Sequence, residues 1–119
     1  MRFRIVSGDI DPTAGILFQM DSKGTSGYLL RVSGRTNELI FHYLLRGKRR
    51  DLRFAGIDPL EPGTWHTISV VRRGTRLRVS YDGAERMSVR DELYSKGTVG
   101  VWTEDDTVVD FAELTATAR

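Results

Sequence analysis

Two short turns place the middle of the chain in an antiparallel β-sheet. Arg73-Gly74 and Asp82-Gly83 separate segments in which apolar and polar residues alternate. Successive side chains of a strand point to opposite faces, so this period of two predicts strands with one buried face. Glycine in a two-residue turn accepts the positive backbone φ that a tight hairpin requires. Residues 65–89 are therefore expected to form three consecutive antiparallel strands.

The same pattern continues through the rest of the chain. Further strands are expected at residues 2–6, 14–20, 28–33, 38–45, 49–55, 98–103 and 107–117. No segment has the periodicity of a helix of three turns, although residues 90–97 have room for one helical turn. About ten short, evenly spaced strands are typical of an antiparallel β-sandwich or barrel. We predict one all-β domain that spans residues 1–119.

Composition limits the classes of protein to which the chain can belong. The sequence contains no cysteine, which excludes disulfides and thiolate metal sites. It has no apolar run of about 18 residues, so no membrane-spanning helix is expected. Its first residues alternate like a strand and do not resemble a signal peptide, which favours a cytoplasmic protein or a domain of a longer exported one. The net charge of +2 is too small to indicate a nucleic-acid partner.

A series of short motifs runs in a definite order through nearly the whole chain. They are Ser7-Gly8-Asp9-Ile10-Asp11, Ala14-Gly15-Ile16-Leu17-Phe18, Tyr28-Leu29-Leu30-Arg31, Gly47-Lys48-Arg49, Pro62-Gly63-Thr64-Trp65-His66, Tyr81-Asp82-Gly83, Asp91-Glu92-Leu93-Tyr94, Gly97-Thr98-Val99-Gly100-Val101-Trp102-Thr103 and Phe111. Their order and spacing resemble the concanavalin-like, laminin-G-like jelly-roll domains, and most of all the bacterial 3-keto-glycoside hydrolase-like branch. The resemblance implies two stacked antiparallel sheets, one of them curved, with ligands on the concave face.

Strand alternation proposes a binding surface on one face of the predicted sandwich. If Val99 and Val101 point into the core, Trp102 points to the opposite face, and the same reasoning places Arg31 and His42 there. An indole offers a plane to the C–H face of a pyranose ring, and charged side chains can bind its hydroxyl groups. The alternative is a face covered by a loop, with Trp102 in the core and the two polar side chains bonded to backbone carbonyls.

Two further positions join the candidate ligand-binding set through the family resemblance. Related domains carry Asn on the strand of Arg31 and Lys after the Trp-Thr pair. This chain has Ser33 and Glu104 at these positions. The predicted ligand-binding residues are therefore Arg31, Ser33, His42, Trp102 and Glu104.

Metal binding and catalysis have weaker support in the sequence. Asp9, Asp11 and Asp106 lie in two predicted loops, and carboxylates with loop carbonyls suit calcium. The spacing matches no calcium-loop signature, and solvated turn carboxylates are the alternative. No strand carries the paired acids of a glycosidase, and no nucleophile elbow or phosphate loop occurs. The sequence therefore favours a protein without enzymatic activity over an enzyme.

Three functions remain open at this stage. The first is a non-catalytic, lectin-like module that binds a glycan or polysaccharide on the concave face. The second is an interaction domain that self-associates through an open sheet edge, at its first or last strand, and binds no sugar. The third is a small glycoside-acting hydrolase. The cations of residues 46–53 suit a solvated hairpin tip better than a nucleic-acid site, because no aromatic residue is interleaved with them.

Overall fold

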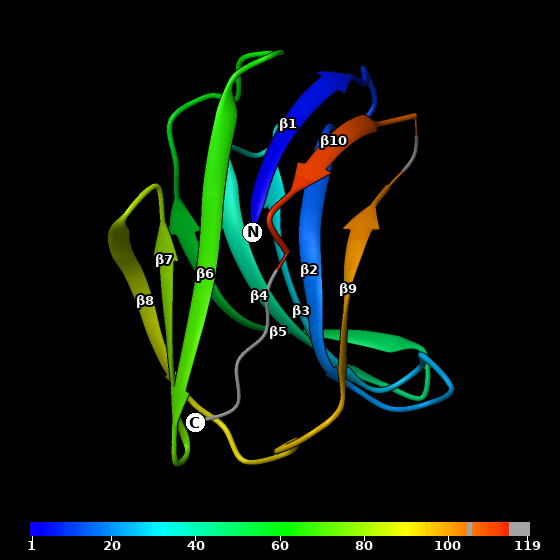
Figure 1. Cartoon of the computed structure of the whole chain (residues 1–119), viewed down its shortest axis with the longest axis vertical. Helices are drawn as coiled ribbons and strands as arrows, with labels where there is room; N and C mark the ends of the chain where they lie inside the picture. The colour runs from blue at the N-terminus through cyan, green and yellow to red at the C-terminus, as the bar shows by residue number, and fades with distance from the viewer. Residues whose placement is uncertain (105, 115–119) are drawn as a thin grey trace.

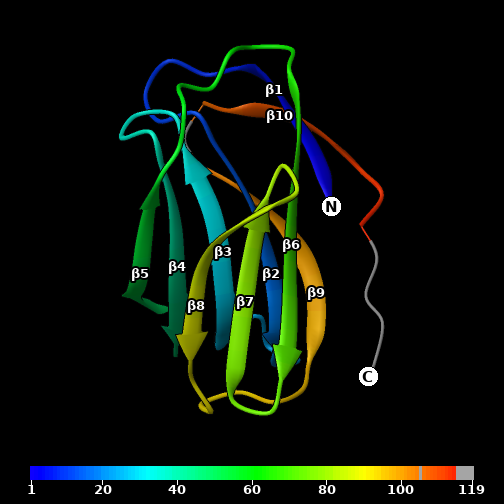
Figure 2. The ribbon, with the colours of Figure 1, turned by 90° about the vertical axis from the view of Figure 1, so that its left-hand side faces the viewer.

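Two antiparallel β-sheets stack face to face (Figure 1), and in the turned view one sheet lies in front of the other (Figure 2). The computed structural model describes residues 1–104 and 106–114. These residues form no helix, and hence none of the long apolar helices that a bilayer crossing needs. The strands are β1 (Arg2–Ser7), β2 (Thr13–Met20), β3 (Gly27–Ser33), β4 (Glu38–Leu45), β5 (Lys48–Gly56), β6 (Trp65–Arg73), β7 (Arg76–Tyr81), β8 (Ala84–Arg90), β9 (Thr98–Thr103) and β10 (Val108–Ala112).

Each layer contains five strands. One sheet has the order β10-β1-β6-β7-β8 and the other has the order β5-β4-β3-β2-β9, with antiparallel pairing throughout. The predicted all-β, two-sheet sandwich of about ten strands is therefore confirmed. The first strand is paired on both sides, with β10 and β6, so it is not a sheet edge as the self-association hypothesis supposed.

Two hairpin turns carry positive φ at both central residues. These angles are 51° and 79° at Arg46-Gly47, and 51° and 83° at Asp82-Gly83. Two positive φ values in a two-residue loop match the twist of the flanking strands, so the turn fixes the register of the hairpin. The turn at Arg46-Gly47 accordingly places Leu45 opposite Lys48.

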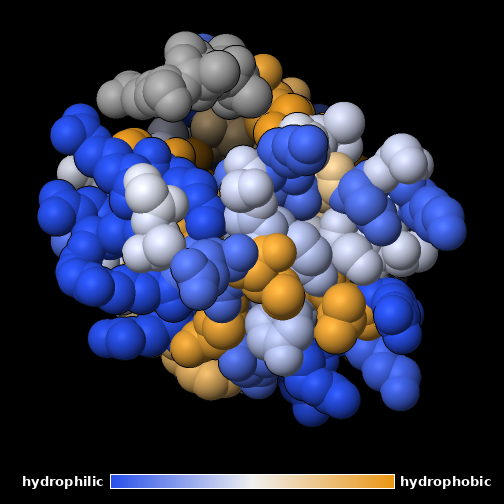
Figure 3. Space-filling view, turned by 90° about the horizontal axis from the view of Figure 1, so that it is seen from below, coloured by the Kyte–Doolittle hydropathy of each residue, from blue (hydrophilic) through white to orange (hydrophobic). Residues whose placement is uncertain are grey.

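The surface differs in character between the two sides of the sandwich. Seen from below, hydrophilic side chains gather on the side where β7 and β8 lie (Figure 3). These strands carry the exposed cations Arg78, Arg86 and Arg90. This side is therefore well hydrated, in contrast to the uncharged border strand β9.

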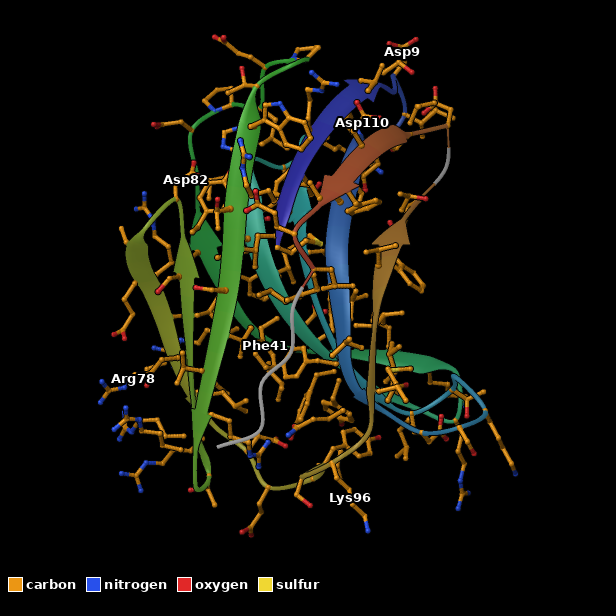
Figure 4. All side chains as sticks on the ribbon, in the orientation of Figure 1. Asp9, Phe41, Arg78, Asp82, Lys96 and Asp110 are labelled. Carbon is orange, nitrogen blue, oxygen red and sulfur yellow. The ribbon has the colours of Figure 1, made fainter. Side chains whose placement is uncertain are left out.

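The main core lies between the two sheets. Phe41 occupies its middle (Figure 4) and is fully buried, as are Phe3, Tyr28 and Leu77. Aromatic rings of β2, β3 and β4 contact one another here, with the centroids of Tyr28 and Phe41 5.6 Å apart. Inward-facing positions of both sheets supply this core, as strand alternation predicts.

Four details depart from the expectations drawn from the sequence. The turn expected at Arg73-Gly74 lies one residue later, at Gly74-Thr75, because Arg73 still belongs to β6 and pairs with Arg76. Val99 and Val101 point between the sheets, but 43% and 42% of their surface stays exposed, because the facing sheet covers this border strand only in part. The last strand ends at Ala112 instead of continuing to residue 117, and residues 115–117 lie outside the described part. Residues 91–97 connect β8 to β9 without a helical turn.

Candidate ligand-binding site

The outer face of the sheet β5-β4-β3-β2-β9, which is turned away from the other sheet, brings the predicted site residues together. One cross-strand row contains Trp102, Gly15, Arg31, Ile40 and Phe54. The neighbouring row contains Gly100, Leu17, Leu29, His42 and Asp51. Arg31, His42 and Trp102 thus share one face, whereas their contact with a ligand stays a prediction.

Gly15 separates Trp102 from Arg31 in the first row and leaves room for both. A Cβ at Gly15 would lie 2.7 Å from the carbonyl oxygen of Leu30 and 2.9 Å from Cβ of Arg31. Both distances are shorter than a normal van der Waals contact, so only glycine fits here without a shift of the backbone. The missing side chain leaves space over β2, across which Arg31 approaches Glu104.

A chain of polar contacts connects Arg31, His42 and Asp51. Nε of Arg31 donates a hydrogen bond to Nε2 of His42 over 2.9 Å. Nδ1 of His42 lies 2.7 Å from Oδ1 of Asp51. Because Nε2 accepts a hydrogen bond, the proton of the neutral ring is on Nδ1, the nitrogen that lies close to the carboxylate.

The imidazole of His42 stays neutral at physiological pH. Burial and, to a smaller extent, the nearby Arg31 and Arg49 guanidinium groups lower the pKa of His42 to about 4, against the opposing effect of Asp51. The ring is almost completely buried. His42 is therefore a hydrogen-bond acceptor for Arg31 and not a second cation.

Glu104 connects three side chains of this face. Its Oε1 accepts a hydrogen bond of 3.0 Å from Nε1 of Trp102 and also pairs with the guanidinium of Arg49. Its Oε2 lies 3.9 Å from Nη1 of Arg31. These contacts fix the orientation of the indole and hold Arg49 and Glu104 over the buried Arg31.

The Arg49–Glu104 pair also shows how strongly the sheet curves. Arg49 belongs to β5 and Glu104 follows β9, so the two residues come from opposite borders of the sheet. Four strand spacings in a flat sheet amount to about 19 Å, too far for these two side chains to meet. The outer face must therefore be concave, and its bend is visible where β4 and β5 turn toward their hairpin (Figure 1).

Asp11, which the sequence suggested as a calcium ligand, belongs to the same polar cluster. Its Oδ1 accepts a hydrogen bond of 2.8 Å from the buried hydroxyl of Ser33. Its Oδ2 lies 3.8 Å from Nη1 of Arg31. The loop before β2 thus supplies a second carboxylate to the guanidinium of Arg31.

The other two calcium candidates take part in a contact between loops. The carboxylate of Asp106 accepts hydrogen bonds from the backbone N–H groups of Asp9, at 3.1 and 3.2 Å, and Ile10, at 3.3 Å. These N–H groups hold the pKa of Asp106 below its usual value. Asp9 itself lies at one end of the sandwich (Figure 4). Within residues 1–104 and 106–114, no three acidic or histidine side chains form a group that could hold a metal.

An apolar surface borders the polar cluster on the same face. Met20, Leu29 and Leu44 form a small buried cluster, against which Leu17 and Trp102 pack. A shallow groove of about 500 Å³ begins there, lined by Leu17, Met20, residues 21–24 and residues 98–100. Trp102 therefore lies at the boundary between an apolar and a charged half of the concave face.

The structure also contains site residues that the sequence analysis did not include. The sequence predicts a solvated basic hairpin for residues 46–53, yet Arg49 and Asp51 of this segment contact the polar cluster. The two-residue turn at Arg46-Gly47 carries the signal that could have identified Asp51, because counting back from it pairs His42 with Asp51. No local signal indicates Arg49, since its contact with Glu104 depends on the curvature of the sheet.

Comparison with known proteins identifies the family. The family model of the laminin G domain matches residues 11–109, which is most of the chain. The chain belongs to the laminin G domain family. The predicted resemblance to concanavalin-like, laminin-G-like jelly rolls is confirmed. No curated protein matches this laminin G domain in sequence.

Solved structures share the fold of this laminin G domain at low sequence identity. The carbohydrate binding module CBM66 from Bacillus subtilis superimposes with a TM-score of 0.79 and 18% identity, covering 91% of this chain and 67% of the module. Sheep galectin-11, in a complex with glycerol, has a TM-score of 0.57 and 10% identity, covering 85% of this chain and 88% of the galectin. At such identities the likeness establishes the jelly-roll architecture.

Proposed function

We propose that this laminin G domain is a non-catalytic module that binds a glycan on the concave face at Trp102. The observation that carries the proposal is the partly exposed indole of Trp102, which Glu104 fixes at the boundary of the apolar and charged halves. A fixed aromatic ring loses little conformational freedom when a sugar stacks on it. The site is therefore preorganised for a ligand with both an apolar face and hydroxyl groups.

The exposed charged groups around Trp102 provide the polar part of such a site. The side chains of Glu104, Arg49 and Asp51 are 18%, 38% and 53% exposed. Guanidinium groups donate hydrogen bonds and carboxylates accept them, so together they match sugar hydroxyls, which do both. We assign the direct contacts to Trp102, Glu104, Arg49 and Asp51.

The buried residues of the predicted set have a positioning role in this proposal. Arg31, His42 and Ser33 are 8%, 1% and 1% exposed and lie beneath the exposed groups. Ser33 orients the carboxylate of Asp11, and His42 lies beside the carboxylate of Asp51. Arg31 stabilises the charges of Asp11 and Glu104 from below.

The bonding of the carboxylates supports a binding module over a hydrolase. Asp11 accepts from Ser33, Asp51 faces His42, and Glu104 binds Trp102 and Arg49. A glycosidase needs two carboxyl groups that are free to face the same glycosidic bond, one of them as an acid. The structural neighbours support the same choice, since one is named a carbohydrate binding module and the other a galectin.

Replacement of the two tryptophans tests the proposal. Trp102→Ala should weaken glycan binding at least tenfold, or about 1.4 kcal/mol, in a glycan array followed by calorimetry on each ligand found. Trp65→Ala is the matched control, because Trp65 lies on the other sheet with its ring between Arg2 and Arg4. Absence of any glycan ligand for the wild type, or equal binding by both variants, would refute the proposal.

A further inference from the structure

Strand β9 is a sheet border that the fold leaves open. It hydrogen-bonds to β2 on one side, and no other strand of the described residues pairs with its second side (Figure 1). Its six residues, Thr98 to Thr103, carry no charge. Val99 and Val101 point between the sheets and keep 43% and 42% of their surface in water. An uncharged border strand with exposed apolar side chains is a template for pairing with another strand.

Each of the other three border strands carries at least one charged residue. Strand β5 contains Lys48, Arg49, Arg50, Asp51 and Arg53, and β8 contains Glu85, Arg86 and Arg90. Strand β10 has Asp110 near its middle, paired with Arg4 of β1. Charges on a border strand are a common means of preventing edge-to-edge association. This protection is absent from β9 alone among the four borders of the described residues.

We propose that β9 pairs antiparallel with β9 of a second copy of this chain, with the two-fold axis at Gly100. The pairing would join the two sheets β5-β4-β3-β2-β9 into one continuous sheet across the dimer. A two-fold axis brings the same surface of both copies together, so the contact requires a self-complementary strand. An uncharged strand meets this requirement because no like charges oppose each other across the axis.

The sequence of β9 fits this register residue by residue. With Gly100 on the axis, Val99 of each copy faces Val101 of the other, which covers the exposed apolar surface of both. Cross-strand pairs of β-branched residues stabilise antiparallel sheets. Gly100 has no side chain, so the two backbones can approach at the axis.

The dimer would also present two copies of Trp102 on one side of the joined sheet. Trp102 lies next to Val101 in the sequence and points to the outer face, away from the paired valines. The inference itself rests on the open border and not on glycan binding, so either proposal can fail while the other holds.

A charge placed on β9 tests the pairing in solution. Sedimentation velocity over a range of concentrations should show a monomer–dimer equilibrium for the wild type. Val101→Lys should raise the dissociation constant of the dimer at least tenfold, because an inward-pointing charge on a border strand opposes pairing. Val108→Lys on β10 is the matched control, since Val108 is also an exposed valine of a border strand, 53% exposed. A wild type that is monomeric at every concentration would overturn the proposal, as would a dimer that Val108→Lys alone dissociates.

A single cysteine tests the register, because the native chain has none. A Cβ at Gly100 would meet nothing closer than 3.9 Å, so Gly100→Cys fits the monomer. Residues on the axis of an antiparallel pair lie within the range of Cα distances that a disulfide spans. Gly100→Cys should therefore form a disulfide-linked dimer under mild oxidation with oxidised glutathione. Gly56→Cys on β5, where a Cβ also has open space, should stay monomeric. Equal cross-linking of both variants would rule out the β9 axis.

Discussion

The guanidinium of Arg31 donates a hydrogen bond from Nε to Nε2 of His42, beneath the exposed groups of the concave face. The bond explains how two basic side chains share a buried space: one is a cation, and the other is its neutral acceptor. Asp11 and Glu104 approach the same guanidinium from the other side. The buried pair thus supports the carboxylates that border the surface, and its protonation state controls the stability of the whole cluster.

Acid should destabilise the fold through His42. The unfolded histidine binds a proton below its ordinary pKa of 6.5, whereas the folded one does so only below about 4. Between these values the unfolded chain holds more protons, so the free energy of unfolding falls as the pH is lowered. The shift corresponds to roughly 3 kcal/mol lost between pH 7 and pH 4.

Urea unfolding at several pH values measures this loss. His42→Gln is the control, because the amide can still accept from Arg31 and has no titration in this range. The wild type should lose more stability than the variant between pH 6.5 and 4. If the free energy of unfolding fell equally with pH in both proteins, the neutral state assigned to His42 would be contradicted.

Removal of the buried cation should be costly. Arg31→Met leaves the carboxylates of Asp11 and Glu104 without their shared guanidinium, and we expect a loss of about 3 kcal/mol in the free energy of unfolding. Arg78→Met is the control, since Arg78 points away from the sandwich (Figure 4) and its side chain is 59% exposed. The control should change stability by less than about 0.5 kcal/mol. Similar small losses in both variants would show that Arg31 contributes no more than a surface charge.

A methyl group at Gly15 should disturb the site from within the sheet. Gly15→Ala places a Cβ 2.7 Å from a carbonyl oxygen of β3, and overpacking of this kind typically costs about 1–3 kcal/mol. The variant should also bind glycan more weakly, because Trp102 and Arg31 both contact this position through neighbouring strands. Gly56→Ala has open space for its Cβ and should unfold at the wild-type temperature. A Gly15→Ala protein with unchanged melting would show that β2 and β3 shift at little cost.

The Asp106 carboxylate should stabilise the contact between two loops through hydrogen bonds and should not act as a metal ligand. Asp106→Ala removes the acceptor for the N–H groups of Asp9 and Ile10, so we expect a lower melting temperature. A chelator should leave the melting temperature of the wild type unchanged. A drop on addition of the chelator, reversed by calcium, would show that a cation shares these carboxylates.

Much of the fold follows from local pattern. Alternation and the turn at Asp82-Gly83 predicted the hairpin of β7 and β8, and the parity of β3 and β4 placed Arg31 and His42 on one face. Parity could not show that both side chains are buried, because burial depends on what lies above them. Here that cover comes in part from Arg49 and Glu104, which are 55 residues apart in the sequence.

The sequence alone determined where most strands lie, where most turns join them and toward which face the side chains of regular strands point. These properties depend on a few neighbouring residues, through steric limits on φ and the two-residue repeat of a strand. Only the tertiary structure decided that the sheet bends enough for Arg49 to meet Glu104, that Asp11 reaches Arg31, and that β9 stays partly uncovered. Curvature and coverage arise from the packing of two whole sheets, and no local stretch of sequence contains that information.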